Sequence, residues 1–207
     1  MKKILIIFFL FSINLSAQNI GNDTLDIEIE KPIKRFSLGL KIGTPNMIGG
    51  AVQYTLPVLN NHISPYINFS GYDIEIDNTQ INLNYSEYGL KLYFSDKAKG
   101  LYAGIGASSF KSSLAYKDVS LSGGLSGDGS VDLNIDTTIL KLGIKTGGTL
   151  YFSLELGYGF GEIPNQLTFN AISSTGISES VTEEIPKIPG IGSNGMVVGN
   201  IGFGISF

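Results

Sequence analysis

The last eleven residues of the chain alternate between apolar and small or polar side chains. One face of an extended strand here is apolar, interrupted only by Gly199, and consists of Val197, Ile201, Phe203, Ile205 and Phe207. The other face is mostly small and polar and consists of Val198, Asn200, Gly202, Gly204 and Ser206. A period of two residues predicts a β-strand. Such a strand either packs its apolar face on a soluble core or turns it toward lipid around a polar lumen.

Seven further segments show the same alternation. They are Phe36–Gly43, Ile48–Leu56, His62–Tyr72, Ile81–Phe94, Leu101–Phe110, Thr138–Lys145 and Leu150–Phe160. These segments are close to the roughly 9–11 residues that a tilted transmembrane strand needs. The sequence therefore predicts an all-β fold, an eight-stranded antiparallel up-and-down transmembrane β-barrel. Closing the barrel leaves no unpaired backbone in lipid, and an even number of strands places both ends on one side.

A soluble lipocalin-like barrel or sandwich is the alternative fold. It would turn Leu140, Leu142, Leu154 and Leu156 inward and leave mostly Gly, Ser, Tyr and a few Lys on the outside. Such an exterior solubilises a protein poorly. The glycine content, 27 of 207 residues, instead suits a narrow lumen, and the aromatic residues suit interfacial girdles.

The N-terminus predicts export. Lys2 and Lys3 precede the apolar run Ile4–Phe11, and small residues follow before Gln18. This pattern indicates a signal peptide over residues 1–18, because the apolar run is shorter than the roughly 20 residues of an uncleaved membrane anchor. We expect residues 19–35 to form a periplasmic tail and residues 36–207 to form the barrel. The expected location is the outer membrane of a Gram-negative cell envelope, with both mature termini periplasmic.

The net charge and the absence of cysteine exclude several classes of binding partner and covalent link. Removing the signal peptide removes two lysines and no acid, so the formal charge changes from −4 to −6. An acidic exported chain does not suit nucleic acid. The chain has no Cys, which excludes an acylated cysteine anchor, disulfides and thiolate metal sites.

The lengths of the connections between strands predict that the two ends of the barrel differ. Segments 73–80, 111–136 and 161–194 are expected to be loops, the last two long and extracellular, whereas the connections after the second, fourth and sixth strands are short. The apolar phase changes near Tyr85 within the fourth strand. Either a bulge shifts the register or the strand continues beyond the membrane, and we favour the second interpretation.

Five charged residues fall on the inward face of the predicted strands: Lys41, Glu87, Lys91, Lys141 and Glu155. We expect Lys141 and Glu155 to be cross-strand neighbours in the hairpin around residues 146–148. A charge in a narrow lumen needs partners. The five residues therefore form either a gate or ion-selective constriction or a structural network that fills the barrel.

Other candidate sites are weaker. The acidic groups Asp73, Glu75 and Asp77, and Glu179, Glu183 and Glu184, could bind divalent cations shared with lipopolysaccharide, or form a solvated face. His62 is the only His and falls at the predicted periplasmic rim, and no G-x-S-x-G motif accompanies it. We therefore expect no enzymatic activity, no cofactor and no metal site.

From residue 36 to the end, the chain resembles the small eight-stranded barrels of the outer membrane protein A and X type. The resemblance rests on the signal peptide, the eight alternating strands and the terminal Phe207 preceded by Ile205 and Phe203. It implies that Phe203, Ile205 and Phe207 are read by the outer-membrane assembly machinery. We see no peptidoglycan-binding domain after the barrel and therefore expect no such tethering role.

Members of this class are adhesins, structural proteins, weak pores or unassigned. The expected function is a structural or surface-interaction role carried by long extracellular loops, with outer-membrane lipid, lipopolysaccharide and an unidentified loop partner as contacts. The alternatives are a small porin-like channel with a lumen Lys/Glu gate and a soluble periplasmic ligand-binding barrel.

Overall fold

The computed structural model describes residues 33–95, 97–121, 125–173, 175–184 and 191–207. The expected signal peptide and residues 19–32 of the expected tail lie outside these residues. The part from Ile33 to Phe207 forms one compact unit. Its strands are β1 (Phe36–Thr44), β2 (Met47–Tyr54), β3 (Ile63–Ile76), β4 (Thr79–Tyr93), β5 (Gly100–Ser120), β6 (Ser126–Lys145), β7 (Leu150–Phe160), β8 (Gln166–Ser173), β9 (Ser178–Glu184), β10 (Ile191–Gly192) and β11 (Gly195–Ser206), and a short 3-10 turn, η1 (Leu59–Asn61), follows β2.

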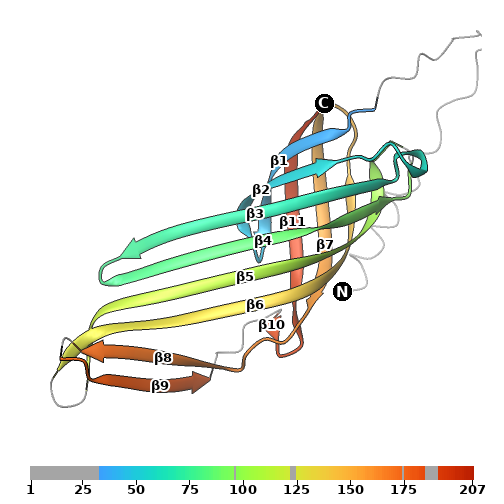
Figure 1. The fold of residues 1–207 in the computed structure, drawn as a ribbon. Coiled ribbons are helices and arrows are strands. Elements are labelled where there is room, and N and C mark those ends of the chain that lie inside the picture. The colour runs from blue at the N-terminus through green and yellow to red at the C-terminus, as the bar shows by residue number, and fades with distance from the viewer. Residues whose placement is uncertain (1–32, 96, 122–124, 174, 185–190) are drawn as a thin grey trace, which may run out of the picture. The chain divides into compact units, whose positions relative to one another are not determined.

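Eight of these strands close into a barrel (Figure 1). Each of β1 to β6 pairs antiparallel with the next strand, and β11 pairs with both β7 and β1. The closing ladder between β1 and β11 runs from the Ser37–Ser206 pair to the Thr44–Gly199 pair. The ladder between β2 and β3 is much shorter and joins residues 50–53 to residues 66–69. The predicted fold class, an eight-stranded antiparallel up-and-down barrel, is confirmed.

The two ends of the barrel differ. At one end, which we call the terminal rim, β1 begins and β11 ends, and the connections after β2, β4 and β6 turn back. At the opposite end, which we call the hairpin rim, the strands continue for unequal distances. β1, β2, β7 and β11 have 8 to 12 residues, whereas β3, β4, β5 and β6 have 14, 15, 21 and 20.

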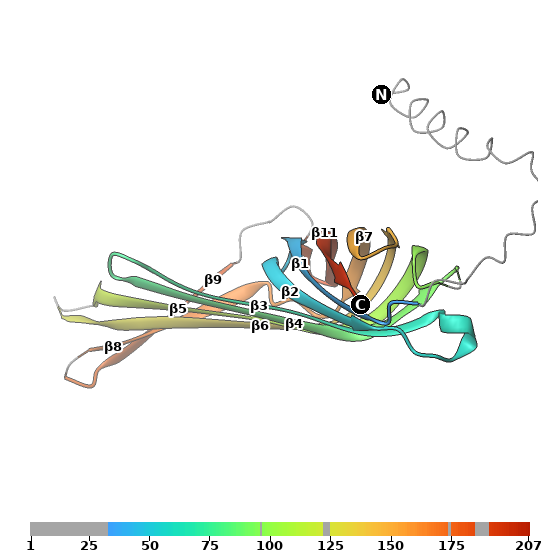
Figure 2. The same ribbon diagram turned by 90° about the horizontal axis from the view of Figure 1, so that it is seen from above.

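The long strands project beyond the hairpin rim as an open sheet, which we call the extension (Figures 1 and 2). The hairpin of β8 and β9 adds to its edge, because residues 127–130 of β6 pair with residues 170–173 of β8. The expected loops at 73–80, 111–136 and 161–194 are therefore wrong in part, because each contains paired strand. Their polar and Gly/Ser-rich composition hid the alternation that continues through them.

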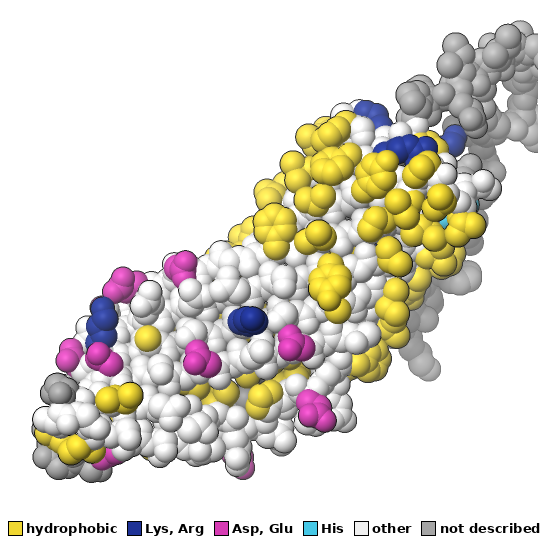
Figure 3. Space-filling model, in the orientation of Figure 1, with side chains coloured by type: hydrophobic (Ala, Val, Ile, Leu, Met, Phe, Trp, Pro, Cys, Tyr) yellow, Lys and Arg dark blue, Asp and Glu magenta, His cyan; other side chains and the backbone are white. Residues whose placement is uncertain are grey.

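The apolar side of the sheet changes faces between the barrel and the extension. In the barrel, rows of paired residues on the outer face are apolar, such as Leu92, Ala103, Leu142 and Leu156. In the extension the outer row of Asp73, Asn82, Ser113 and Asp132 is polar, and the adjacent inner row of Ile74, Ile81, Leu114 and Val131 is apolar. The outer surface is accordingly hydrophobic over the barrel and carries Asp and Glu over the extension (Figure 3). Lipid around the barrel and water around the extension account for the change.

This change of face explains the apolar phase of β4. The ladders on both sides of β4 run without a shift from Thr79 to Tyr93, so the structure contains no bulge there. Tyr85 points inward with Glu87, and Leu83 and Ile81 continue the same inner side. The favoured interpretation, a strand that continues past the membrane, agrees with this geometry.

A small apolar cluster closes the barrel beneath the extension. Ile135 of β6 packs with Ile163 and Met196, and Phe110 and Leu133 pack against them. Met196 belongs to β11 and Ile163 to the segment after β7, so the cluster fills the place where the short strands end. The extension is thereby joined to the barrel by side chains as well as by continuous strands.

The closing seam contains one pair of facing glycines. Gly39 of β1 lies opposite Gly204 of β11. A Cβ added to Gly39 would collide with the hydroxyl group of Tyr151 and with the carbonyl oxygen of Phe203. The glycines therefore make room for the Tyr151 ring inside the lumen.

The change of face predicts unequal costs in stability for the same substitution at two outward positions of β6. Leu142→Arg places a charge in the lipid-facing band and is expected to destabilise the barrel by about 2–4 kcal/mol. Asn134→Arg, on the same face eight residues earlier, is expected to change stability by less than about 0.5 kcal/mol. Urea unfolding in phosphatidylcholine vesicles measures both. Equal costs would contradict the assignment of lipid and water to the two parts.

Candidate functional site

The five inward charges of the sequence lie together in the lumen. Lys41 comes from β1, Glu87 and Lys91 from β4, Lys141 from β6 and Glu155 from β7, and their side chains are at most 5% exposed. Alternation along each strand turns them inward, and the register brings them to similar heights. Glycines opposite them leave room, since Lys41 pairs with Gly49 and Gly202, and Lys141 with Gly104 and Gly157.

Glu155 is the centre of this network. Its Oε1 accepts hydrogen bonds from Lys91 Nζ at 2.7 Å and from the Tyr102 hydroxyl group at 2.5 Å. Its Oε2 accepts from Lys41 Nζ at 2.6 Å and from Lys141 Nζ at 3.1 Å. The four donors come from β1, β4, β5 and β6, so one carboxylate on β7 connects five strands across the lumen.

The carboxylate of Glu87 also accepts four hydrogen bonds, two at each oxygen atom. Its Oε1 accepts from Lys141 Nζ at 2.5 Å and from the Tyr66 hydroxyl group at 2.6 Å. Its Oε2 accepts from Asn68 Nδ2 at 2.8 Å and from the Tyr85 hydroxyl group at 3.0 Å. Lys141 bridges the two carboxylates, which makes the two clusters one network.

Aromatic rings surround the lysine ammonium groups. Lys141 Nζ lies 4.1 Å from the centre of the Tyr66 ring, and Lys91 Nζ lies 4.6 Å from that of Tyr102. Both separations are within the range of a cation–π interaction. Tyr66 and Tyr102 thus make two kinds of contact with the network. Their hydroxyl groups donate hydrogen bonds to the carboxylates, and their ring faces contact the lysine ammonium groups.

The arrangement suits closure of the lumen. Eight strands leave an interior just wide enough for side chains, and the near-complete burial of all five charges leaves no wide aqueous path past them. A buried ion pair with all its hydrogen bonds made is stable as a set but costly to break, because one charge is then left unpaired. The network can therefore act as a rigid plug.

The structure brings the five charges together in the lumen, but the register between β6 and β7 differs from the expected one. Glu155 lies opposite Gly143 and Lys141 opposite Gly157, so the two are diagonal rather than direct neighbours, although they are in contact. The turn is centred later than expected, since Lys145 pairs with Ser153.

Tyr85 and Lys145 are among the members of the lumen that sequence reasoning does not identify. The apolar phase of the sequence changes near Tyr85, whereas the structure shows that the Tyr85 hydroxyl group donates to Glu87. Lys145 is also buried inside the barrel. Its position four residues after Lys141, in the same phase of a strand, is the signal that could have found it.

The C-terminal residues point outward. Phe203, Ile205 and Phe207 are exposed on the apolar face of β11, and the ring of Phe207 lies 5.1 Å from that of Phe36. This places them on the lipid-facing surface at and near the terminal rim. Their role as an assembly signal stays a prediction.

The other candidates lie apart from the network. His62 follows η1 at the terminal rim, with Nδ1 2.7 Å from the carbonyl oxygen of Leu59. The acidic group at 73–77 belongs to the edge formed by β3, and the group at 179–184 to β9 at the opposite edge of the extension. Among the described residues, no group of three or more potential metal ligands comes together. No helix in that part of the chain is long and apolar enough to cross a membrane.

Comparison with solved structures identifies the fold. A major outer membrane protein from Thermus thermophilus aligns with a TM-score of 0.51 and 12% identity, over 84% of this chain and 98% of that chain. The chain has the fold of an outer-membrane β-barrel. Two Acinetobacter baumannii proteins, CarO and CarO2, align with TM-scores of 0.48 and 0.47 and identities of 13% and 15%, over 84% and 86% of this chain and 98% and 100% of theirs. No protein-family model and no curated protein matches the sequence.

The central position of Glu155 predicts a large effect of neutralising it. Glu155→Gln leaves Lys41 and Lys91 without an acidic hydrogen-bond partner and is expected to destabilise the barrel by about 3–5 kcal/mol. Glu184→Gln, on exposed β9, is the matched control and is expected to change stability by less than about 0.5 kcal/mol. Urea unfolding in vesicles measures both, and a small effect of Glu155→Gln would show that the network does not stabilise the fold.

Proposed function

We propose that this protein is an integral outer-membrane barrel with a closed lumen that anchors a surface-interaction sheet outside the membrane. The observation that carries the proposal is the amphipathic extension formed by β3, β4, β5, β6, β8 and β9. The proposal includes no catalytic step and no cofactor.

The extension has the build of a binding surface. Two adjacent rows of paired residues cross its inner face, and their apolar and aromatic side chains are half-buried except for Val131, which is buried. They are Tyr72, Leu83, Ser112 and Leu133, then Ile74, Ile81, Leu114 and Val131. Loops need no such order, and contiguous apolar surface outside a membrane marks sites of interaction.

The positions of the first and last barrel strands support the proposed orientation of the barrel in the membrane. The first barrel strand begins and the last one ends at the terminal rim, and the extension lies beyond the hairpin rim. A chain exported through a signal peptide and inserted from the periplasm keeps its termini there. The proposal therefore places the extension on the cell surface and replaces the expected long loops by a folded sheet.

The lumen supports an anchor rather than a channel. Glu155 and Glu87 each accept four hydrogen bonds, and a conducting pathway would have to separate these partners. A porin-like channel gated by the Lys and Glu residues is the alternative, and it requires the network to open.

Planar-bilayer conductance separates the two functions. The refolded mature chain is expected to form no stable channels, and Lys141→Ala and Glu155→Ala are expected to form none or only brief ones, because tyrosines still fill the lumen. Circular dichroism confirms that each chain is folded. If the wild-type chain formed stable channels and both variants changed their ion selectivity, the anchor function would be wrong and the protein would be a gated pore.

Binding of a neutral fluorescent dye tests the extension directly. In lipid nanodiscs, 1-aminoanthracene is expected to gain fluorescence with the wild-type protein beyond that of empty discs, because an apolar surface excludes water from the dye. Replacing the paired residues Ile74 and Ile81 by Asn is expected to reduce that gain. Replacing the adjacent outer pair, Glu75 and Gln80, by Asn is the control and should leave it unchanged. An equal response in both double variants would contradict a binding role for the inner face.

A further inference from the structure

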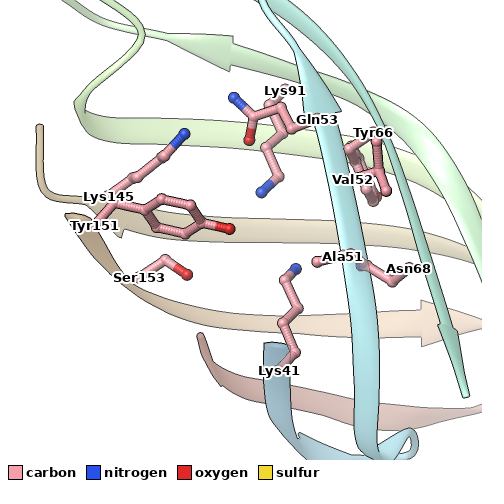
Figure 4. Close-up of a pocket in the computed structure, with 10 residues that line it drawn as sticks. All are labelled: Lys41, Ala51, Val52, Gln53, Tyr66, Asn68, Lys91, Lys145, Tyr151 and Ser153. Atoms are coloured by element: carbon pink, nitrogen blue, oxygen red, sulfur yellow. The ribbon is translucent and has the colours of Figure 1, made fainter. Parts of the chain in front are cut away.

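A small cavity lies beside the charge network, on the side of the terminal rim. Three lysines line it, namely Lys41, Lys91 and Lys145, together with Gln53, Tyr151 and Ser153 and four further residues (Figure 4). Its free space is about 10 Å³. This is about the space that one water molecule needs, so a single particle of that size fits.

Lysines outnumber acids inside the barrel. Four lysines are buried among the described residues, namely Lys41, Lys91, Lys141 and Lys145, but only two acids, Glu87 and Glu155. Both carboxylates are already saturated by the network. With all six groups charged, the described interior carries two positive charges in excess.

Lys145 is the lysine that the network leaves out. Its Nζ donates to the hydroxyl group of Ser37 at 2.7 Å and lies 4.4 Å from the centre of the Tyr151 ring. Neither partner carries a negative charge, and no carboxylate in the described part of the chain forms an ion pair with it. A buried ammonium group without a counter-ion is costly.

The geometry points to a site for one small inorganic anion of the halide class, with chloride as the ligand, between Lys145 and the lysines of the network. Lys145 supplies the charge that no protein acid balances, and Lys41 and Lys91 line the same cavity with ammonium groups. Ser153 and Tyr151 place hydroxyl groups on its wall. The cavity is too small for phosphate or for an organic acid, since each has several non-hydrogen atoms.

The site goes beyond the anchor function and does not depend on it. A closed barrel can hold a chloride ion as a structural counter-ion, and an open one would hold it as a bound ion in its path. Conductance measurements therefore leave the site undecided, and a separate experiment is needed.

Stability in two salts tests the inference. The full mature chain is refolded into vesicles and unfolded with urea, because guanidinium chloride would itself supply the ligand. Sodium chloride is compared with sodium gluconate at equal ionic strength, since gluconate is too large for the cavity. A ligand that binds only the folded state raises the unfolding midpoint with concentration, so we expect a saturable rise in chloride and none in gluconate.

Lys145→Met identifies the residue responsible. The variant is expected to weaken chloride binding by about tenfold or more, as expected for the loss of a charged hydrogen-bond donor. In gluconate it should be at least as stable as the wild type, because an uncompensated buried charge has been removed. Lys111→Met, at an exposed position of β5, is the control and should keep the full chloride response.

Chloride-35 NMR gives an independent readout that does not require unfolding. The wild-type protein is expected to broaden the chloride line, bromide should compete the broadening away, and Lys145→Met should abolish it. A wild-type protein without chloride response in either experiment would overturn the proposal, because Lys145 would then be uncharged or solvated by water. An equal response in the wild type and Lys145→Met would overturn it as well.

Discussion

Every backbone group of a chain in lipid must find its hydrogen-bond partner within the protein, because the surrounding hydrocarbon offers none. In this structure the ladder between β1 and β11 meets that requirement, since it joins the first and last barrel strands over residues 37–44 and 199–206. Small residues lie on the inner side of that ladder. Gly39 and Gly204 let the two strands approach while Tyr151 fills the lumen beside them. Closure of the barrel therefore determines which residues face outward and how much space remains in the lumen.

The interior is organised by charge rather than by apolar packing. A narrow barrel with a lipid-facing exterior has to place its polar residues inside, and polar residues there need partners. Glu155 and Glu87 gather three lysines and three tyrosines into one network to which six strands contribute. Such a network resists distortion of the barrel, since moving any one strand breaks hydrogen bonds on several others. The structure thus couples the shape of the barrel to the pairing of a few buried charges.

The sequence is sufficient to predict the barrel, but it does not predict the extension beyond the hairpin rim. Alternation in segments such as Leu150–Phe160 predicted strands and faces, because lipid outside and a polar lumen inside impose opposite chemistry on neighbouring residues. It also placed Lys41, Glu87, Lys91, Lys141 and Glu155 inside. Alternation could not give their pairing, which depends on the register set by the turn at 146–149. Segment 111–136 looked like a loop because Gly, Ser and Asp interrupt it, and only the ladder between β5 and β6 shows that Leu114 and Val131 continue a sheet.

The change of apolar face along β6 also fixes the depth of the barrel in the membrane. Outward residues Leu140, Leu142 and Ile144 belong in lipid, whereas Asp132 and Asp136 on the same face belong in water. Sinking the barrel would carry carboxylates into hydrocarbon, and raising it would expose leucines to water, at a cost of about 1.5–3 kcal/mol for each. Each long strand repeats this constraint, so vertical movement meets a steep restoring force in both directions. The inner face of the extension is consequently held at a constant height above the bilayer.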